Sequence, residues 1–308
     1  LPEEAPCYPL DEADALLPPA DDGLLSRLAR MPVMIPASAY SESDIEALVN
    51  VQRAAITLCA GRADLLAVLD LPLHFRKREA VEWRQRIDSI PSLMGGSALS
   101  YAAAYHGWVR TPEQSVPALA PDRLVPPAGV VCGMIAAREL ARGVWVGPAN
   151  EPLAGVLGLQ PGIDDRDWAD LYDRQINILR QQPGRFTLMS AFTLYQTDRS
   201  LFQISVRRLM ILMRKLAWRR GMQYAFETNN ERFRQYVQIS FERALRSLMD
   251  RGALAAFEVV TGPELNTPND AYNGRFLIAL KVAPTQPIEF ITVVMLRSGD
   301  NLFEFLEF

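Results

Sequence analysis

The chain has 308 residues, 49% hydrophobic and 22% charged, which is a globular composition and excludes disorder of the whole chain. Its net charge of −4 and its pI near 5.4 give no global sign of nucleic-acid binding. Cys7, Cys59 and Cys132 are far apart and form no CxxC pair, so they suit free thiols better than a disulfide framework or a zinc site. No apolar run approaches the ~20 residues that span a bilayer, and no signal peptide is visible.

The first 22 residues predict an extended connector. They contain no base, five prolines and seven acids: Glu3, Glu4, Asp11, Glu12, Asp14, Asp21 and Asp22. Proline fixes φ and removes a hydrogen-bond donor, so this composition opposes a packed core. We assign residues 1–30 to an extended segment or to the end of an upstream domain, and residues 31–308 to a layered core with sub-lobes 31–160 and 161–308. Because the numbering starts at Leu1, we expect a further segment upstream.

Helices and strands alternate in the first part of the core. After a cap at Ser41 or Ser43, apolar spacing predicts a helix to about Cys59, and the run DLLAVLDL at 64–71 predicts a buried parallel strand. Helices are also predicted at 76–90, at 130–142 and from 163, with strands at 97–109, before 179 and at 186–195. Residues 112–127 and 144–162 are rich in proline or glycine and are expected to be irregular.

Two long helices follow and have the clearest pattern. In the first, Val206, Leu209, Met210, Met213, Leu216 and Ala217 fall on one side at helical spacing. In the second, Thr228 and Glu231 match a capping box, and Gly252 stands where a C′ glycine belongs. Strands are predicted after them at 253–260, 275–282, 288–296 and 302–308. This order predicts a mixed α/β (α+β) layered fold with two long C-terminal helices.

No catalytic constellation is visible. GxSxG, Walker and GxGxxG motifs are missing, and the two histidines, His74 and His106, stand alone. Asp70 at a strand end is similar to a ribose-binding acid, but it lacks a glycine fingerprint. The acids at 164–173 do not match a calcium loop and suit the first turn of a helix. We therefore expect no cofactor, no metal and no enzymatic activity.

Two features point to assembly instead. The first long helix carries a basic side with Arg207, Arg208, Arg214, Lys215 and Arg219, and no acid occurs from Arg199 to Phe226. This side is either solvated or a docking face for an acidic protein partner. The last seven residues are strongly β-prone and apolar on both faces: Leu302, Phe303, Glu304, Phe305, Leu306, Glu307 and Phe308. Such a terminal strand either pairs in its own sheet or is donated to a neighbour.

Several segments together resemble contractile tail sheath proteins. Residues 126–133 (PPAGVVCG) are similar to the family's "PPSG…AG", residues 143–151 (GVWVGPANE) to its "GVWKAPAN", and residues 155–159 (GVLGL) to its "GV.GL". In the same order, residues 101–108 resemble "YAALYYPW", residues 206–209 "VNVRRL", residues 226–232 "FEPNDE" and residues 282–290 "VAPVKPAEF". The likeness covers roughly residues 50–296 and is greatest to sheaths of extracellular contractile injection systems.

This resemblance implies a structural subunit that polymerises helically around an inner tube and contracts, without nucleotide, to drive the tube through a target membrane. The implied partners are identical or paralogous sheath subunits, the inner tube, and baseplate and cap proteins, with no direct contact to nucleic acid and no insertion into the membrane. Assembly would take place in the bacterial cytoplasm, within a phage tail or a released phage-tail-like particle. The resemblance also implies exchanged terminal strands, for which 302–308 is our candidate, and we expect the basic side of the first long helix to contact an acidic tube.

The sequence departs from the family at several places. Val146 replaces a lysine, Phe192-Thr193-Leu194 stands where "WG.RTL" is expected, and the C-terminus runs past the usual end. The family's strand-exchanging N-terminal arm is not visible. Two alternatives stay open: an α/β enzyme with a Rossmann-like core around 64–71 and a pocket near Asp70, or a baseplate or terminator protein that shares the sheath fold.

Overall fold

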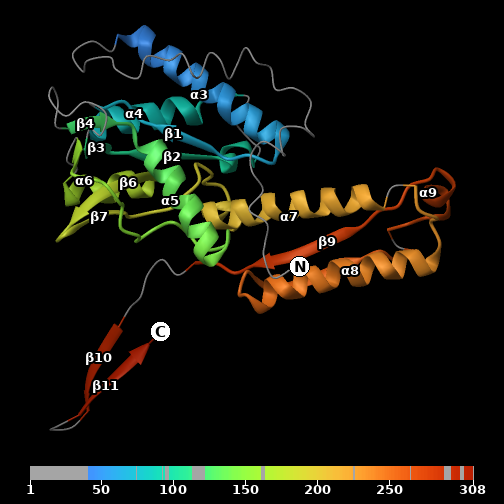
Figure 1. The fold of residues 1–308 in the computed structure, drawn as a ribbon. Coiled ribbons are helices and arrows are strands. Elements are labelled where there is room, and N and C mark those ends of the chain that lie inside the picture. Colours follow the sequence, from blue (N-terminus) through green and yellow to red (C-terminus); the bar gives the residue numbers. More distant parts are fainter. Residues whose placement is uncertain are drawn as a thin grey trace.

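The computed structural model describes residues 41–73, 75–91, 93, 97–112, 122–160, 164–224, 226–263, 265–287, 293–298 and 302–307. The predicted connector 1–30, His74 and Phe308 lie outside the described residues. Within them the chain forms an α/β lobe, a second lobe of two long helices and a β-ribbon, and a C-terminal hairpin (Figure 1). The predicted mixed α/β class is confirmed.

The first lobe is built on a four-stranded sheet with strand order β1-β2-β6-β7. Its strands are β1 (Ala67–Asp70), β2 (Ala102–His106), β6 (Ile176–Gln182) and β7 (Arg185–Leu188). The pairs β1–β2 and β2–β6 are parallel, as predicted for the run at 64–71, whereas β7 returns antiparallel through the Pro183-Gly184 turn. Because β6 and β7 belong to this sheet, the first lobe crosses the boundary predicted at residue 160.

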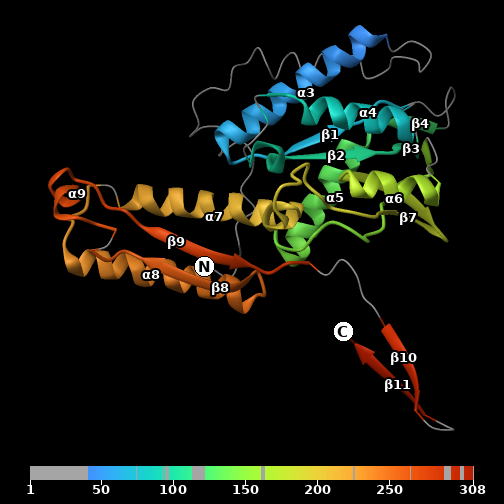
Figure 2. The same ribbon diagram turned by 180° about the vertical axis from the view of Figure 1, so that it is seen from behind.

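Helices cover both faces of this sheet (Figures 1 and 2). The helices are α3 (Glu42–Arg62), α4 (Lys77–Asp88), α5 (Pro127–Arg142) and α6 (Asp165–Asp173). Ala102 and Ala104 of β2 pack with α3, α4 and α6, while Ala103 and Tyr105 pack with α5. This alternation is the period of two of a strand buried on both faces. The predicted cap at Ser41 is confirmed, because Ser41 and Asp44 form a reciprocal capping box.

The single strand predicted at 97–109 is wrong. A short 3₁₀ helix, η2 (Ser97–Tyr101), precedes β2, and Gly107 at φ +105° separates β2 from β3 (Trp108–Pro112). That φ value favours glycine, and it lets the chain leave the parallel sheet. It enters a small antiparallel sheet of order β4-β3-β5, whose other strands are β4 (Asp122–Val125) and β5 (Gly158–Gln160). Two regions predicted as irregular therefore each contribute a strand.

The strand predicted at 186–195 ends early, at Leu188. Beyond it, the buried Asn177 side chain holds the chain in another conformation. Its Nδ2 donates to the carbonyl oxygens of Ala104 and Phe192, at 3.1 and 2.8 Å, and its Oδ1 accepts from the Phe192 amide at 2.7 Å. The amide and the carbonyl of Phe192 are thus bonded to a side chain instead of to a neighbouring strand.

The second lobe consists of α7 (Ile204–Gln223), α8 (Glu231–Asp250), β8 (Leu254–Val260), β9 (Ala279–Pro284) and the short α9 (Pro268–Tyr272). A separate core joins both long helices to the β8–β9 ribbon. The predicted cap Thr228 is wrong. Asn230 caps α8, because its Oδ1 accepts from the Phe233 amide at 2.8 Å. Gly252 at φ +78° ends α8 as predicted, in a Schellman pattern of Gly252 N–H to Met249 O and Ala253 N–H to Leu248 O.

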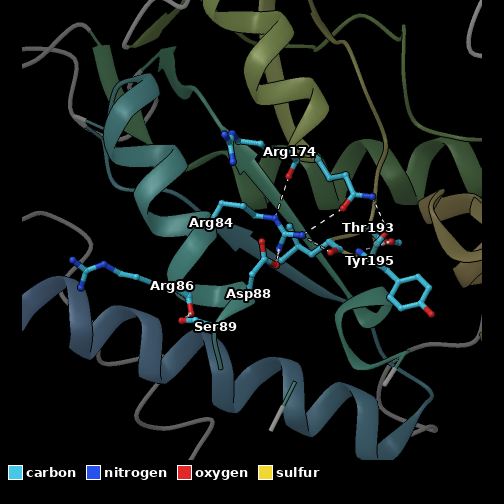
Figure 3. Close-up of polar contacts among 9 residues, drawn as sticks. Arg84, Arg86, Asp88, Ser89, Arg174, Thr193 and Tyr195 are labelled. Atoms are coloured by element: carbon cyan, nitrogen blue, oxygen red, sulfur yellow. Dashed lines mark hydrogen bonds and ion pairs between the residues drawn. The ribbon is translucent and has the colours of Figure 1, made fainter. Parts of the chain in front are cut away.

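A buried arginine joins three elements of the first lobe (Figure 3). The side chain of Arg84, on α4, is 1% exposed. Its Nε donates to Arg174 O at 3.1 Å and its Nη2 to Leu194 O at 2.6 Å, while Nη1 lies 3.0 Å from Asp88 Oδ1. Burial lowers the pKa of Arg84 to about 10, so the guanidinium stays charged at neutral pH. One charged group thus fixes α4 against the α6–β6 connection and the coil before α7.

Candidate assembly interface

The C-terminal strands form a hairpin apart from both lobes (Figures 1 and 2). β10 (Val293–Ser298) pairs antiparallel with β11 (Leu302–Glu307), from Val293 opposite Glu307 to Ser298 opposite Leu302. They form a two-stranded sheet, so among the described residues each strand has one edge without a β partner. The predicted terminal strand exists, and its own neighbour occupies one edge. Its donation to another subunit stays a prediction.

The β8–β9 ribbon is a second two-stranded sheet with open edges. It is antiparallel, with a register irregularity between Leu254 and Ala256. Leu254 and Val259 are buried against the helices, and Lys281 Nζ lies 3.0 Å from Glu258 Oε2 on the outer face. Within the described residues neither strand has a second β partner. Open backbone edges of this kind accept further strands.

The predicted basic side of α7 divides into two parts. Near the start of the helix, Arg207 is buried, donates a hydrogen bond to Ser100 Oγ and stacks on the Tyr101 ring at 4.1 Å. Burial lowers the pKa of Arg207. Arg208 pairs with Glu139 of α5. Both side chains therefore fix α7 to the first lobe, which the spacing of basic residues alone did not indicate.

The remaining basic residues lie farther along α7 and nearer to solvent. Arg214 is exposed, and Lys215 and Arg219 are half-buried. Trp218 lies among them with 67% of its surface exposed. Only this part of the predicted docking face is accessible to a partner.

Asp70, one of the residues considered for catalysis, has a structural role. Asp70 Oδ1 accepts the Ala128 amide at 2.7 Å, and the Asp70 carbonyl accepts Gln52 Nε2 at 2.9 Å. The first bond caps α5, whose N-cap, Pro126, has no capping side chain. His106 is fully buried, and burial lowers its pKa to about 4. Among the described residues, no cluster of three or more His, Cys, Asp or Glu side chains is placed to hold a metal ion.

The acids at 164–173 lie on α6 as predicted. Asp164 is the N-cap residue of α6, and Lys77 of α4 pairs with Asp167 at 3.5 Å and with Asp170. These carboxylates bind the neighbouring helix and stabilise the start of α6. These contacts account for the acidic residues of α6 without a bound ligand.

No helix in the described ranges has the length and apolar character to cross a membrane.

A surface feature of α8 was missed by the sequence reasoning. Arg232, Tyr236, Ile239 and Arg243 are all exposed on this helix. Their spacings of four, three and four residues place them along one side. The spacing of these four residues is visible in the sequence, but it coincides with the stronger apolar pattern of the buried side of the same helix.

Comparison with known proteins identifies the fold. The family described as the phage tail sheath C-terminal domain matches residues 196–296. A sheath chain of the extracellular contractile injection system PVC, in its contracted state, is 27% identical, with a TM-score of 0.66 over 82% of this chain and 68% of that one. The contracted helical sheath of the anti-feeding prophage is 22% identical, with a TM-score of 0.59 over 94% of this chain and 86% of that one.

Baseplate chains of the same particles also match. A chain from the anti-feeding prophage baseplate is 23% identical, with a TM-score of 0.63 over 82% of this chain, and the present chain spans 66% of its length. No curated protein sequence matches the chain significantly. The domain at 196–296 lies in the second lobe and its connections, and the sheath likeness extends through the first. Residues 196–296 are therefore a phage tail sheath C-terminal domain, and the chain as a whole has the fold of contractile sheath subunits.

Proposed function

We propose that this chain is a non-enzymatic subunit of a contractile sheath, which assembles helically with copies or paralogues of itself around an inner tube. The observation that carries the proposal is the likeness to a contracted sheath subunit, 27% identical over 82% of the chain. Baseplate and cap proteins would complete the particle at its ends. Assembly takes place in the cytoplasm, and contraction, which needs no nucleotide, drives the tube through a target membrane.

Contraction requires subunits that change neighbours without separating. Strand exchange supplies such a link, because backbone hydrogen bonds form between chains while the lobes reorient. The open edges of the C-terminal hairpin and of the β8–β9 ribbon support this role. Residues 302–308, together with 288–296, would be donated to an adjacent copy.

Deleting residues 300–308 should leave a folded protein that forms no sheaths. The deletion removes β11 and leaves β10. Because the hairpin lies apart from both lobes (Figure 1), the three cores of the lobes stay intact. The measurement is negative-stain microscopy of the particles, together with circular dichroism of the truncated chain. Sheaths of normal length from the truncated chain would contradict strand donation by this segment.

The accessible basic residues of α7 are proposed to contact an acidic inner tube. Charge reversal in R214E/K215E/R219E should weaken tube-guided assembly, because three attractions become repulsions. The same number of subunits per tube, measured by co-sedimentation at low and physiological salt, would contradict the proposal. R53E is a matched control, because Arg53 is an exposed arginine of α3 on the other lobe.

A second candidate function has specific support. The matches to baseplate chains favour a ring-forming relative that shares the sheath fold. Electron microscopy of the purified protein separates the two, because a sheath subunit gives filaments tens of nanometres long, whereas a baseplate or terminator component gives closed rings.

A further inference from the structure

The exposed side of α8 combines basic and apolar groups. Arg232, Tyr236, Ile239 and Arg243 form what we call the α8 stripe. Tyr236 is 62% and Ile239 52% exposed, whereas the opposite side of the helix is buried in the core of the second lobe. Exposed apolar side chains that are flanked by charge are a common mark of a binding surface.

The two arginines of the stripe have no acidic partner in the part of the chain that the structure describes. Neither Arg232 nor Arg243 takes part in an ion pair or a side-chain hydrogen bond there. Guanidinium groups bind carboxylates through two parallel hydrogen bonds. The chemistry of the α8 stripe therefore suits an acidic peptide that also carries apolar side chains.

The chain contains such a peptide. We propose that the α8 stripe binds the acidic segment 1–22 of the same chain. That segment has seven acids and no base, and Tyr8, Leu10, Leu16 and Leu17 are interspersed among its acids. Carboxylates would pair with Arg232 and Arg243, and apolar side chains would cover Tyr236 and Ile239. This arrangement matches the stripe in both charge and hydrophobicity.

The connection is long enough for binding within one chain. Residues 23–40 separate the segment from the start of α3 and span up to about 60 Å when extended. A compact chain of this length has a radius of gyration of about 19 Å. Tethering also raises the effective concentration to the millimolar range, so that a few exposed ion pairs suffice for binding. The proposal uses α8 and segment 1–22 only, and it does not depend on the sheath function.

The test exploits the scarcity of lysine, because the chain has only Lys77, Lys215 and Lys281. R243K keeps the charge of the stripe and adds an amine that a carbodiimide joins to a carboxylate in direct contact. Cross-links from residues 1–22 of the full chain, mapped by mass spectrometry, are expected at position 243 at least fivefold more often than at Lys215. Adding R232E to R243K should lower that yield about fivefold, the factor for the loss of one exposed ion pair.

Controls separate binding within one chain from chance encounter. R53E in the R243K background should leave the yield unchanged, and 0.5 M salt should reduce it, because exposed pairs are screened. Equal cross-linking to position 243 and Lys215, or a yield that R232E leaves unchanged, would overturn the proposal. When isotope-labelled and unlabelled chains are mixed, links found mainly between the two labels would overturn binding within one chain.

Discussion

Replacing Arg84 with alanine is expected to lower the free energy of unfolding by about 3–5 kcal/mol. The guanidinium is buried and donates to the carbonyl oxygens of Arg174 and Leu194, which come from segments about 90 and 110 residues away in sequence. Alanine leaves the buried Leu194 carbonyl and the partly buried Arg174 carbonyl without these donors, and it removes the charge that faces Asp88. Water cannot replace these bonds without entry into the core of the first lobe. The effect should therefore far exceed that of an ordinary surface substitution.

The measurement is urea denaturation followed by circular dichroism. Arg86 gives a matched control on the same helix, because its side chain is 36% exposed and pairs with Glu42 at the surface. R86A should cost no more than about 1 kcal/mol. Figure 3 shows the two arginines leaving α4 in different directions, with Arg84 directed to the coil around Thr193 and Tyr195. Equal losses of stability in R84A and R86A would show that the buried network contributes little.

Neutralising Asp70 is expected to stabilise the protein at neutral pH. Burial raises the pKa of Asp70 from 3.8 to about 6, although the hydrogen bond from the Ala128 amide lowers it in part. In D70N the amide oxygen still accepts that N–H, and no charge is buried. The variant should therefore be more stable than the wild type at pH 7.5, by up to about 3 kcal/mol for a shift of this size.

The contribution of Asp70 to the free energy of unfolding falls as the pH rises. The pKa of Asp70 is higher in the folded than in the unfolded chain, so the folded state binds the proton more readily. The stability that comes from this protonation is complete below the unfolded pKa and is lost as the pH rises through about 6. Acidification from pH 7.5 to 5 should then stabilise the wild type by about 1.4 kcal/mol relative to D70N. Urea denaturation at both pH values measures the difference.

D173N is the control for this experiment, because Asp173 is an exposed carboxylate of α6. Its stability should follow that of the wild type at both pH values. If D70N and the wild type differ by the same amount at pH 7.5 and at pH 5, Asp70 does not titrate in this range. The buried carboxylate would then have to be stabilised by groups other than the Ala128 amide.

The secondary structure could be predicted from the sequence where local signals act alone. Ser41 with Asp44 and Gly252 after α8 fixed helix ends through short-range hydrogen bonds. Prediction failed where contacts distant in sequence decide the conformation. The strand predicted at 186–195 ends at Leu188 because Asn177 bonds to the chain beyond it, and the partners of Asn177 lie 15 and 73 residues away in sequence. The spacing of apolar residues along the chain contains no information on hydrogen bonds between residues so far apart in sequence.

The same limit applies to the two candidate assembly segments, whose role in assembly stays a prediction. The terminal strand could be found from its own composition, and β11 is present. The basic side of α7 had the right spacing, yet Arg207 and Arg208 contact Ser100 and Glu139 of the first lobe. Only the packing of that lobe decides which arginines stay accessible. The family likeness could be recognised because it combines many weak motifs in a fixed order.

One continuous helix belongs to both lobes. Ile204, at the start of α7, is buried in a core of the first lobe, while Leu209 and Met213 lie in the core of the second. No proline interrupts the helix between them, so bending it there would break backbone hydrogen bonds. α7 therefore connects the two lobes rigidly, so that a displacement of one lobe is transmitted to the other. In the proposed sheath, the flexible parts would then be the connections between subunits.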